Sequence, residues 1–247
     1  MSTALKKVFF TIVAFVALFS LICSVAASTV LNSATMGGLF GELPSENKQI
    51  LMEKGIAPSQ YGAYAVSLCN YLSGQGEMCV IRDSEGNLVP AFSDTAGQNG
   101  ESKQNVHLKD VRGITMFLIR ARYFGGGGAL AVLAGLYIFC RLKKKPFPAK
   151  EVLFGFMMAC VLLIVMVLAV ALWAVIDFNG FFYQAHTLVF TGNDYWLLDN
   201  SFPLMAFMPQ SFFEAYAGKL LWAELPIFGI MVCLIILYFK FKKDKNE

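Results

Sequence analysis

Hydrophobic residues form four long runs along this chain, separated by two long segments and one short basic segment. The runs cover residues 8–27, 124–140, 152–176 and 220–239, and the second run extends back to Phe117. A helix needs about 20 mostly apolar residues to cross the hydrocarbon core of a bilayer. The pattern therefore predicts four transmembrane helices.

The long segment between the first two runs has patterns of its own. Residues 47–56 and 61–71 carry apolar side chains at helical spacing, whereas residues 78–82 and 88–92 flank a turn-forming sequence and predict a hairpin. Residues 93–102 are polar and rich in glycine, which indicates a mobile surface loop. This segment is predicted to be a small domain of mixed structure rather than a simple connection.

The predicted fold class is an all-α integral membrane protein: four transmembrane helices, a mixed extracytoplasmic cap and an interfacial aromatic loop. Hydrophobic residues make up 57% of the chain and the mean hydropathy is +0.58, which supports the membrane class. The predicted segments are the first transmembrane helix (1–28), the cap (29–118), the second helix (119–141), a cytoplasmic loop (142–151), the third helix (152–176), the membrane-interface loop (177–219), and the fourth helix with a basic cytoplasmic tail (220–247).

Charge predicts the orientation, because Lys and Arg are retained on the cytoplasmic side of a membrane. Basic residues dominate both termini and residues 141–150, whereas residues 28–118 carry nine acidic against six basic side chains. Residues 177–219 carry four acidic side chains and one basic side chain. Both termini are therefore expected in the cytoplasm, and the net charge of +3 argues against a nucleic-acid partner.

The first run also resembles a signal peptide, with Lys6 and Lys7 before it and small residues after it. Cleavage would leave an odd number of crossings, so we interpret it as an uncleaved anchor. Cys69 and Cys79 lie in the predicted cap, where two readings stay open: a disulfide or two reduced thiols.

The two histidines of the chain are the main candidates for chemistry. His107 begins a helical stripe that leads into the second run, and Asp110 lies one turn further on. Asp110 could accept a hydrogen bond from one imidazole nitrogen and leave the other as a base or ligand. Alternatively, both are ordinary polar residues at a helix start.

Three further charged residues lie near the predicted outer membrane surface. Arg120 and Arg122 precede four consecutive glycines, and Glu224 lies just inside the fourth run. The guanidinium groups could bind a lipid or substrate headgroup, or one of them could pair with Glu224. Snorkelling of the arginines to lipid phosphates is the alternative.

The segment 177–219 contains eight phenylalanines although it lies outside the runs. We interpret it as aromatic segments in the membrane interface. It either anchors the protein or forms the wall of an acyl-chain groove, with His186 at the polar mouth and Phe182 and Trp196 as contacts.

The order of these motifs resembles the bacterial lipoprotein intramolecular transacylase (Lit) family. The resemblance rests on His107-Leu108-Lys109-Asp110-Val111, the aromatic run that ends in His186, residues 193–199 and residues 209–214, and it extends over essentially the whole chain.

The resemblance implies an acyltransferase that acts on lipoproteins whose N-terminal cysteine carries a diacylglyceryl thioether. The sn-2 acyl chain would move to the cysteine's α-amino group and leave a lyso-lipoprotein. His107 and His186 would act as catalytic base and acid in an undetermined order, with Asp110 as orienting residue. Arg120, Arg122, Phe182, Trp196 and Glu224 would contact substrate. No cofactor and no metal are expected, because ester-to-amide transfer is downhill and the nucleophile belongs to the substrate.

The expected location is the bacterial cytoplasmic membrane, with the site on the extracytoplasmic side. The expected partners are lipoproteins and membrane lipid, and the protein is expected to act as a monomer. Two alternatives stay open: a metal-dependent membrane hydrolase that uses both histidines and a carboxylate, and a non-enzymatic four-helix scaffold or sensor.

Overall fold

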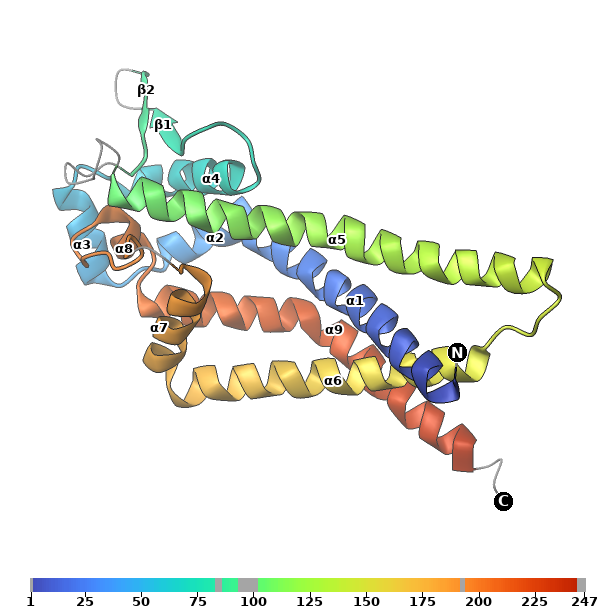
Figure 1. The fold of residues 1–247 in the computed structure, drawn as a ribbon. Helices are drawn as coiled ribbons and strands as arrows, with labels where there is room; N and C mark the ends of the chain where they lie inside the picture. Colours follow the sequence, from blue (N-terminus) through green and yellow to red (C-terminus); the bar gives the residue numbers. More distant parts are fainter. Residues whose placement is uncertain (1, 83–85, 93–101, 192–193, 244–247) are drawn as a thin grey trace. The chain divides into compact units, whose positions relative to one another are not determined.

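The computed structural model describes residues 2–82, 86–92, 102–191 and 194–243 (Figure 1). Its four long helices match the four predicted membrane crossings and are long and apolar enough to span a bilayer. They are α1 (Thr3–Val30), α5 (Lys103–Leu142), α6 (Ala149–Ile176) and α9 (Gln210–Lys243). The predicted surface loop 93–102 and the tip of the predicted hairpin lie almost wholly outside the described residues.

Shorter elements connect the long helices. Between α1 and α5 come α2 (Ser33–Gly41), α3 (Ser45–Glu53), the 3-10 turn η1 (Pro58–Gln60), α4 (Tyr61–Leu72), β1 (Val80–Arg82) and β2 (Leu88–Pro90). The strands pair antiparallel, with Ile81 opposite Val89. Between α6 and α9 lie α7 (Phe178–Val189) and α8 (Pro203–Phe207). The two predicted cap helices and the hairpin are confirmed.

The chain divides into two compact units, which are described separately. The first unit contains Met1–Val25, Leu118–Phe182 and Ala223–Glu247, and the second contains Ala26–Phe117 and Tyr183–Trp222. The first unit therefore holds the apolar parts of the four long helices and the first residues of α7, and the second holds the rest of α7 and the other short elements.

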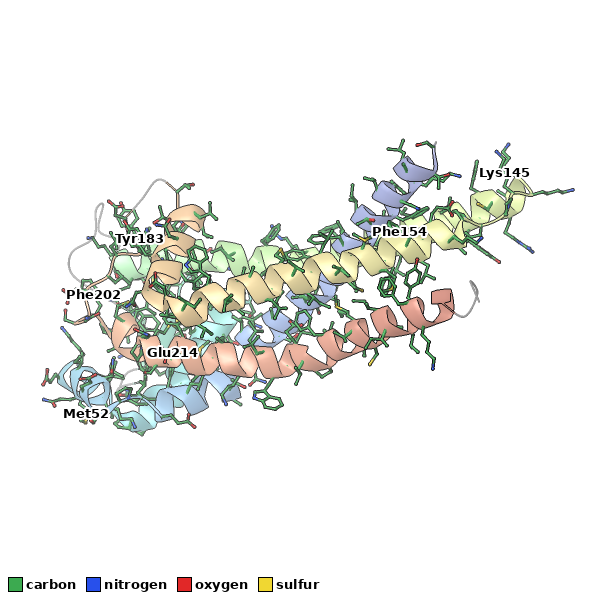
Figure 2. The ribbon with its side chains drawn as sticks, turned by 90° about the horizontal axis from the view of Figure 1, so that it is seen from below. Met52, Lys145, Phe154, Tyr183, Phe202 and Glu214 are labelled. Atoms are coloured by element: carbon green, nitrogen blue, oxygen red, sulfur yellow. The ribbon has the colours of Figure 1, made fainter. Side chains whose placement is uncertain are left out.

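Close helix contacts characterise the first unit. At Gly155 on α6, an added Cβ would lie 2.5 Å from the backbone carbonyl carbon of Phe10 on α1, so only glycine allows this approach. At the same pair of helices, the Lys7 ammonium lies 4.6 Å from the centroid of the Phe154 ring. Figure 2 labels Phe154 on α6 and Lys145 in the segment between α5 and α6.

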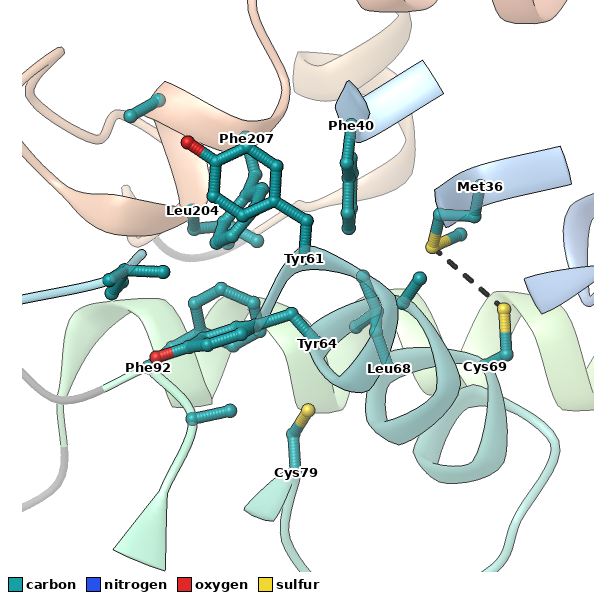
Figure 3. Packing of buried hydrophobic residues seen from close by; sticks show 14 of the residues in the cluster. Met36, Phe40, Tyr61, Tyr64, Leu68, Cys69, Cys79, Phe92, Leu204 and Phe207 are labelled. Carbon is teal, nitrogen blue, oxygen red and sulfur yellow. Dashed lines mark hydrogen bonds between the residues drawn. The ribbon is translucent and has the colours of Figure 1, made fainter. Parts of the chain in front are cut away.

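An aromatic core fills the second unit (Figure 3). Phe207 on α8 is fully buried, and its ring centroid lies 4.5 Å from that of Phe40 and 5.0 Å from that of Tyr64. Part of the aromatic segment 177–219, namely α8 and Phe212 at the start of α9, therefore has protein partners. Their apolar side chains pack against α2 and α4 in a protein core.

Two buried polar side chains hold α8 in place. The amide nitrogen of Asn47 on α3 donates to the Ala206 carbonyl over 3.2 Å. The backbone N–H of Leu204 donates to Oε1 of Gln104 on α5 over 2.9 Å. Because Gln104 is fully buried, this bond ties α8 to the first turn of α5.

Of the two readings left open for Cys69 and Cys79, the structure has two free thiols rather than a disulfide. Cys79 Sγ lies 3.3 Å from Ser67 Oγ, whereas Cys69 Sγ lies 3.8 Å from Met36 Sδ (Figure 3). Burial raises the pKa of each thiol to about 11. Both cysteines are core residues, which corresponds to the second of the two readings.

Candidate active site

The structure brings the two histidines together within the second unit. His107 lies in the second turn of α5, after Gln104, and His186 lies in the last turn of α7. Their ring centroids are 6.1 Å apart, with an angle of 32° between the ring planes. Residues that are far apart in the sequence therefore form a pair of imidazoles.

Two aromatic side chains enclose this pair. The Phe190 ring centroid lies 5.0 Å from that of His107 and 5.4 Å from that of His186. The Trp196 ring centroid lies 5.2 Å from that of His186, and Tyr183 packs edge-on against Trp196 at 5.4 Å. Of the aromatic residues predicted for this site, Trp196 therefore contacts a histidine.

The hydrogen bond predicted from His107 to Asp110 is not made through Nδ1. This nitrogen is buried and has no hydrogen-bond partner among the described residues. Asp110 still interacts electrostatically with the imidazole. Helical spacing places the two residues on one face of α5, but it does not determine where each side chain points.

His107 is held in its neutral form. It precedes the apolar half of α5, which begins after Arg122, and so lies outside the membrane-spanning part of the helix. Burial, and then the neighbouring His186, lower the pKa of His107 to about 4, against a smaller raising effect of Asp110. At neutral pH the imidazole therefore carries no proton on one nitrogen and can accept one.

We expect acidification to destabilise the protein through His107. The pKa of this imidazole is 6.5 in the unfolded chain and about 4 in the folded one, so between these values only the unfolded chain binds the extra proton. Stability is complete above about pH 6.5 and is lost as the pH falls toward about 4. The measurement is the melting temperature in detergent of the protein and of a His107→Gln variant. On acidification the melting temperature of the unsubstituted protein should fall more than that of the variant. A difference independent of pH would contradict this assignment.

A groove of about 560 Å³ lies beside the imidazole pair. One wall is a stripe of α5, formed by Lys109, Asp110, Gly113, Ile114 and Phe117.

The opposite wall is the end of α7 and the residues after it, Val189, Phe190 and Thr191. Neither imidazole lines the groove, but Phe190 touches both rings and also lines it. The groove therefore ends next to the histidines.

The remaining predicted site residues belong to the first unit. Pairing with Glu224 is one of the two readings for Arg120 and Arg122, and no hydrogen bond from either arginine to Glu224 is found among the described residues. Glu224 is 4% exposed and both its carboxyl oxygens have no hydrogen-bond partner. Arg122 instead donates to the hydroxyl of Tyr123, with its guanidinium 4.4 Å from that ring centroid. Phe182 stacks on Phe178, 5.9 Å away.

Sequence reasoning missed Phe190 and Gln104. Phe190 lies four residues after His186, which is the spacing of neighbours on one helix face, and this signal could have identified it. Gln104 lies three residues before His107, but nothing in the sequence marks its partner on α8.

Among the residues that the structure describes, no group of three His, Cys, Asp or Glu side chains is suited to holding a metal ion. The arrangement instead offers a neutral imidazole, a second imidazole at the end of a helix, and an amphipathic groove. These are the parts of a site for proton transfer to and from an amphipathic substrate.

Comparison with known proteins gives the family. The sequence model of the family "Lipoprotein intramolecular transacylase Lit" matches residues 8–213. No curated protein matches the chain.

Two solved structures share the fold. The membrane-integral lipoprotein intramolecular transacylase Lit from Bacillus cereus is 20% identical, with a TM-score of 0.64 and 99% of each chain covered. A variant of that protein with a histidine-to-alanine substitution is 22% identical, with a TM-score of 0.50 and 96% of each chain covered. The chain belongs to the lipoprotein intramolecular transacylase family and is a membrane-integral enzyme.

Proposed function

We propose that this enzyme moves the sn-2 acyl chain of a diacylglyceryl-modified lipoprotein to the α-amino group of the same N-terminal cysteine. A C–N bond forms, the ester C–O bond breaks, and one proton passes from nitrogen to the glyceryl oxygen. The observation that carries the proposal is the imidazole pair beside an amphipathic groove. Ester-to-amide exchange is downhill, so the transfer itself requires no energy source.

His107 is the proton acceptor in this proposal. An α-amino group has a pKa of about 7.7–8, so an imidazole with a pKa of about 4 cannot strip the free ammonium efficiently. Proton transfer is therefore expected after the neutral amine has attacked, when nitrogen carries positive charge and its proton is far more acidic. A neutral, desolvated imidazole suits that step.

His186 is the proton donor to the leaving glyceryl oxygen. It lies in the last turn of α7, where the negative end of the helix dipole stabilises a positive charge. With their ring centroids 6.1 Å apart, the two imidazoles can both reach one reacting ester that lies beside them. A direct or water-mediated proton transfer between the rings would then reset the pair.

Phe190 and Trp196 are proposed to position the substrate and to exclude water. Both rings contact His186, and Phe190 contacts His107 as well. Holding amine and ester in reacting geometry can lower the barrier by about 7–11 kcal/mol, which is more than either proton transfer contributes. Arg120, Arg122 and Phe182 stay proposed substrate contacts in the first unit.

The charge distribution supports a location in the bacterial cytoplasmic membrane, with both termini in the cytoplasm and the histidines on the outer side. We further propose that the enzyme acts as a monomer, because the imidazole pair and the groove are both formed by one chain.

Tandem mass spectrometry of the N-terminal lipopeptide tests this function. Intact mass cannot do so, because moving an acyl chain within one molecule gives an isomer. Coexpression of a lipoprotein with this enzyme should yield fragments with an acylated cysteine nitrogen and a lyso-glyceryl group.

Two other outcomes would overturn the proposed function. A free amine together with released fatty acid would indicate a hydrolase. A free amine with both esters intact would show that this lipoprotein is not a substrate of the assigned reaction.

A further inference from the structure

Asp110 faces the groove beside the histidines. It lines the groove between α5 and the end of α7. The imidazole nitrogen that could have bonded to it, Nδ1 of His107, is buried and has no hydrogen-bond partner in the ranges that the structure describes. The carboxylate is therefore better placed to meet a molecule in the groove than to orient the imidazole through that atom.

The α5 wall of the groove is polar at one end and apolar at the other. Along α5 the lining residues run from Lys109 and Asp110 through Gly113 to Ile114 and Phe117. Each residue advances a helix by about 1.5 Å, so the change from charged to aromatic wall takes roughly 10 Å. The charged end is the end nearer His107 in the chain, and the apolar end leads toward the apolar half of α5.

An N-terminal diacylglyceryl cysteine has the same polarity. Its α-ammonium group is the one positive charge next to the reacting ester, and its acyl chains are apolar. We propose that Asp110 binds this ammonium group and thereby selects substrates with a free amine. The inference rests on the proposed function and assigns it a recognition residue.

The position of Asp110 fits this role. It lies one helical turn after His107, so an amine at its carboxylate is near the imidazole that is to accept the proton. The bound ammonium first loses a proton to solvent, because only the neutral amine can attack the ester. On attack the nitrogen becomes positively charged again, and the carboxylate stabilises that charge more strongly than it stabilises the neutral amine. The N-acylated product has lost the charge, so Asp110 also favours product release.

Lys109 gives the groove a charge of the opposite sign. It is exposed and lies next to Asp110 in the lining. Its ammonium repels the α-ammonium from that side of the groove and attracts the polar peptide carbonyl groups of the substrate. The one carboxylate in the lining is therefore the position at which a substrate amine is stabilised.

Binding of two inert probes tests the proposal. Both are dialkylglyceryl-cysteinyl peptides, whose ether links cannot be transferred. One has a free α-amino group and the other is N-acetylated. Affinities for the full-length enzyme in detergent are measured at about pH 6.5, where the free amine is protonated.

The enzyme should bind the free-amine probe at least about tenfold more tightly, as expected for a charge-assisted hydrogen bond. Asp110→Asn should abolish this preference, because it should lower the affinity for the free-amine probe and leave the affinity for the N-acetylated probe unchanged. Asp110→Glu should retain part of it, and the control Glu53→Gln, which removes an exposed carboxylate from α3, should retain all of it.

A full preference in Asp110→Asn would overturn the proposal, as would equal binding of the two probes by the unsubstituted enzyme. Failure of the proposed function is a separate result, because it appears as absence of N-acylation in the mass-spectrometric test. If Asp110 had a purely structural role, its substitution would change the affinities for both probes equally. If it only oriented the imidazole, its substitution would change the rate of acyl transfer alone. In both cases the ratio of the two affinities would stay the same.

Discussion

Replacing either His107 or His186 by Ala is expected to reduce acyl transfer by about 10²–10⁴-fold or more, to the limit of detection in cells. This is the range that general acid and base groups contribute. The double variant should be little worse than either single variant, because the two imidazoles act on one proton path. The measurement is the rate at which the cysteine nitrogen becomes acylated, followed by fragmentation of the lipopeptide.

The loss must be shown to be chemical rather than structural. Both imidazoles are only half-buried and neither belongs to the aromatic core, so at neutral pH both variants should insert and unfold like the unsubstituted enzyme. Lys54→Ala, an exposed change in the same unit, should retain full activity. Retention of substantial transfer by either histidine variant would refute the assignment of that residue to the proton path.

Much of the fold could be predicted because it follows from periodicity and span length. The four long helices, α3, α4 and the hairpin all correspond to local patterns. The start of α9 at Gln210 could not be derived from hydropathy, because its first two turns are not uniformly apolar. The preceding Pro209, which ends one element and favours a new helix start, is the local signal for this boundary.

The aromatic segment shows the limit of hydropathy arguments. Phe207 and Phe212 are as apolar in a protein core as in a membrane interface, and composition does not distinguish these two environments. The two environments are distinguished only by the residues that pack against these rings, and those residues lie on α2 and α4, far away in the sequence. For the same reason the sequence did not indicate that Gln104 and Asn47 hold α8.

The histidines of the candidate site could be predicted from the sequence because the chain contains so few of them. The chain has two histidines, and the structure places their rings side by side. Side-chain partners were less predictable, because they depend on rotamers and on local competition. Arg122 binds the adjacent Tyr123 instead of Glu224, and Nδ1 of His107 has no hydrogen-bond partner within the described part of the chain, not even Asp110.

Replacing Phe207 by Ala is expected to lower the free energy of unfolding of the second unit by about 3–5 kcal/mol, the usual effect of truncating a buried phenylalanine. The ring is fully buried and contacts Phe40, Tyr61, Tyr64 and Phe92. Its removal leaves a cavity where α8 meets α2 and α4. Denaturant titration followed by hydrogen exchange of peptides from residues 26–117 measures the loss.

Phe124→Ala is the matched control, because this ring is 78% exposed and lies in the first unit. It should change the stability by no more than about 0.5 kcal/mol. Equal effects of the two substitutions would contradict the assignment of Phe207 to the core. Phe207→Leu should recover most of the stability, since it refills most of the cavity.

Phe207→Ala should also slow acyl transfer, although Phe207 does not contact either histidine. α8 is bonded to Gln104, whose Oε1 accepts a hydrogen bond from the backbone N–H of Leu204. Gln104 lies one turn before His107 on α5. Loosening α8 therefore removes a restraint on the turn that carries the proton acceptor. Because reaction rates depend on sub-ångström placement of such groups, transfer should fall in Phe207→Ala and recover in Phe207→Leu. If stability falls while transfer stays unchanged under conditions where the enzyme is folded, the core supports the fold without controlling the geometry of the imidazole pair.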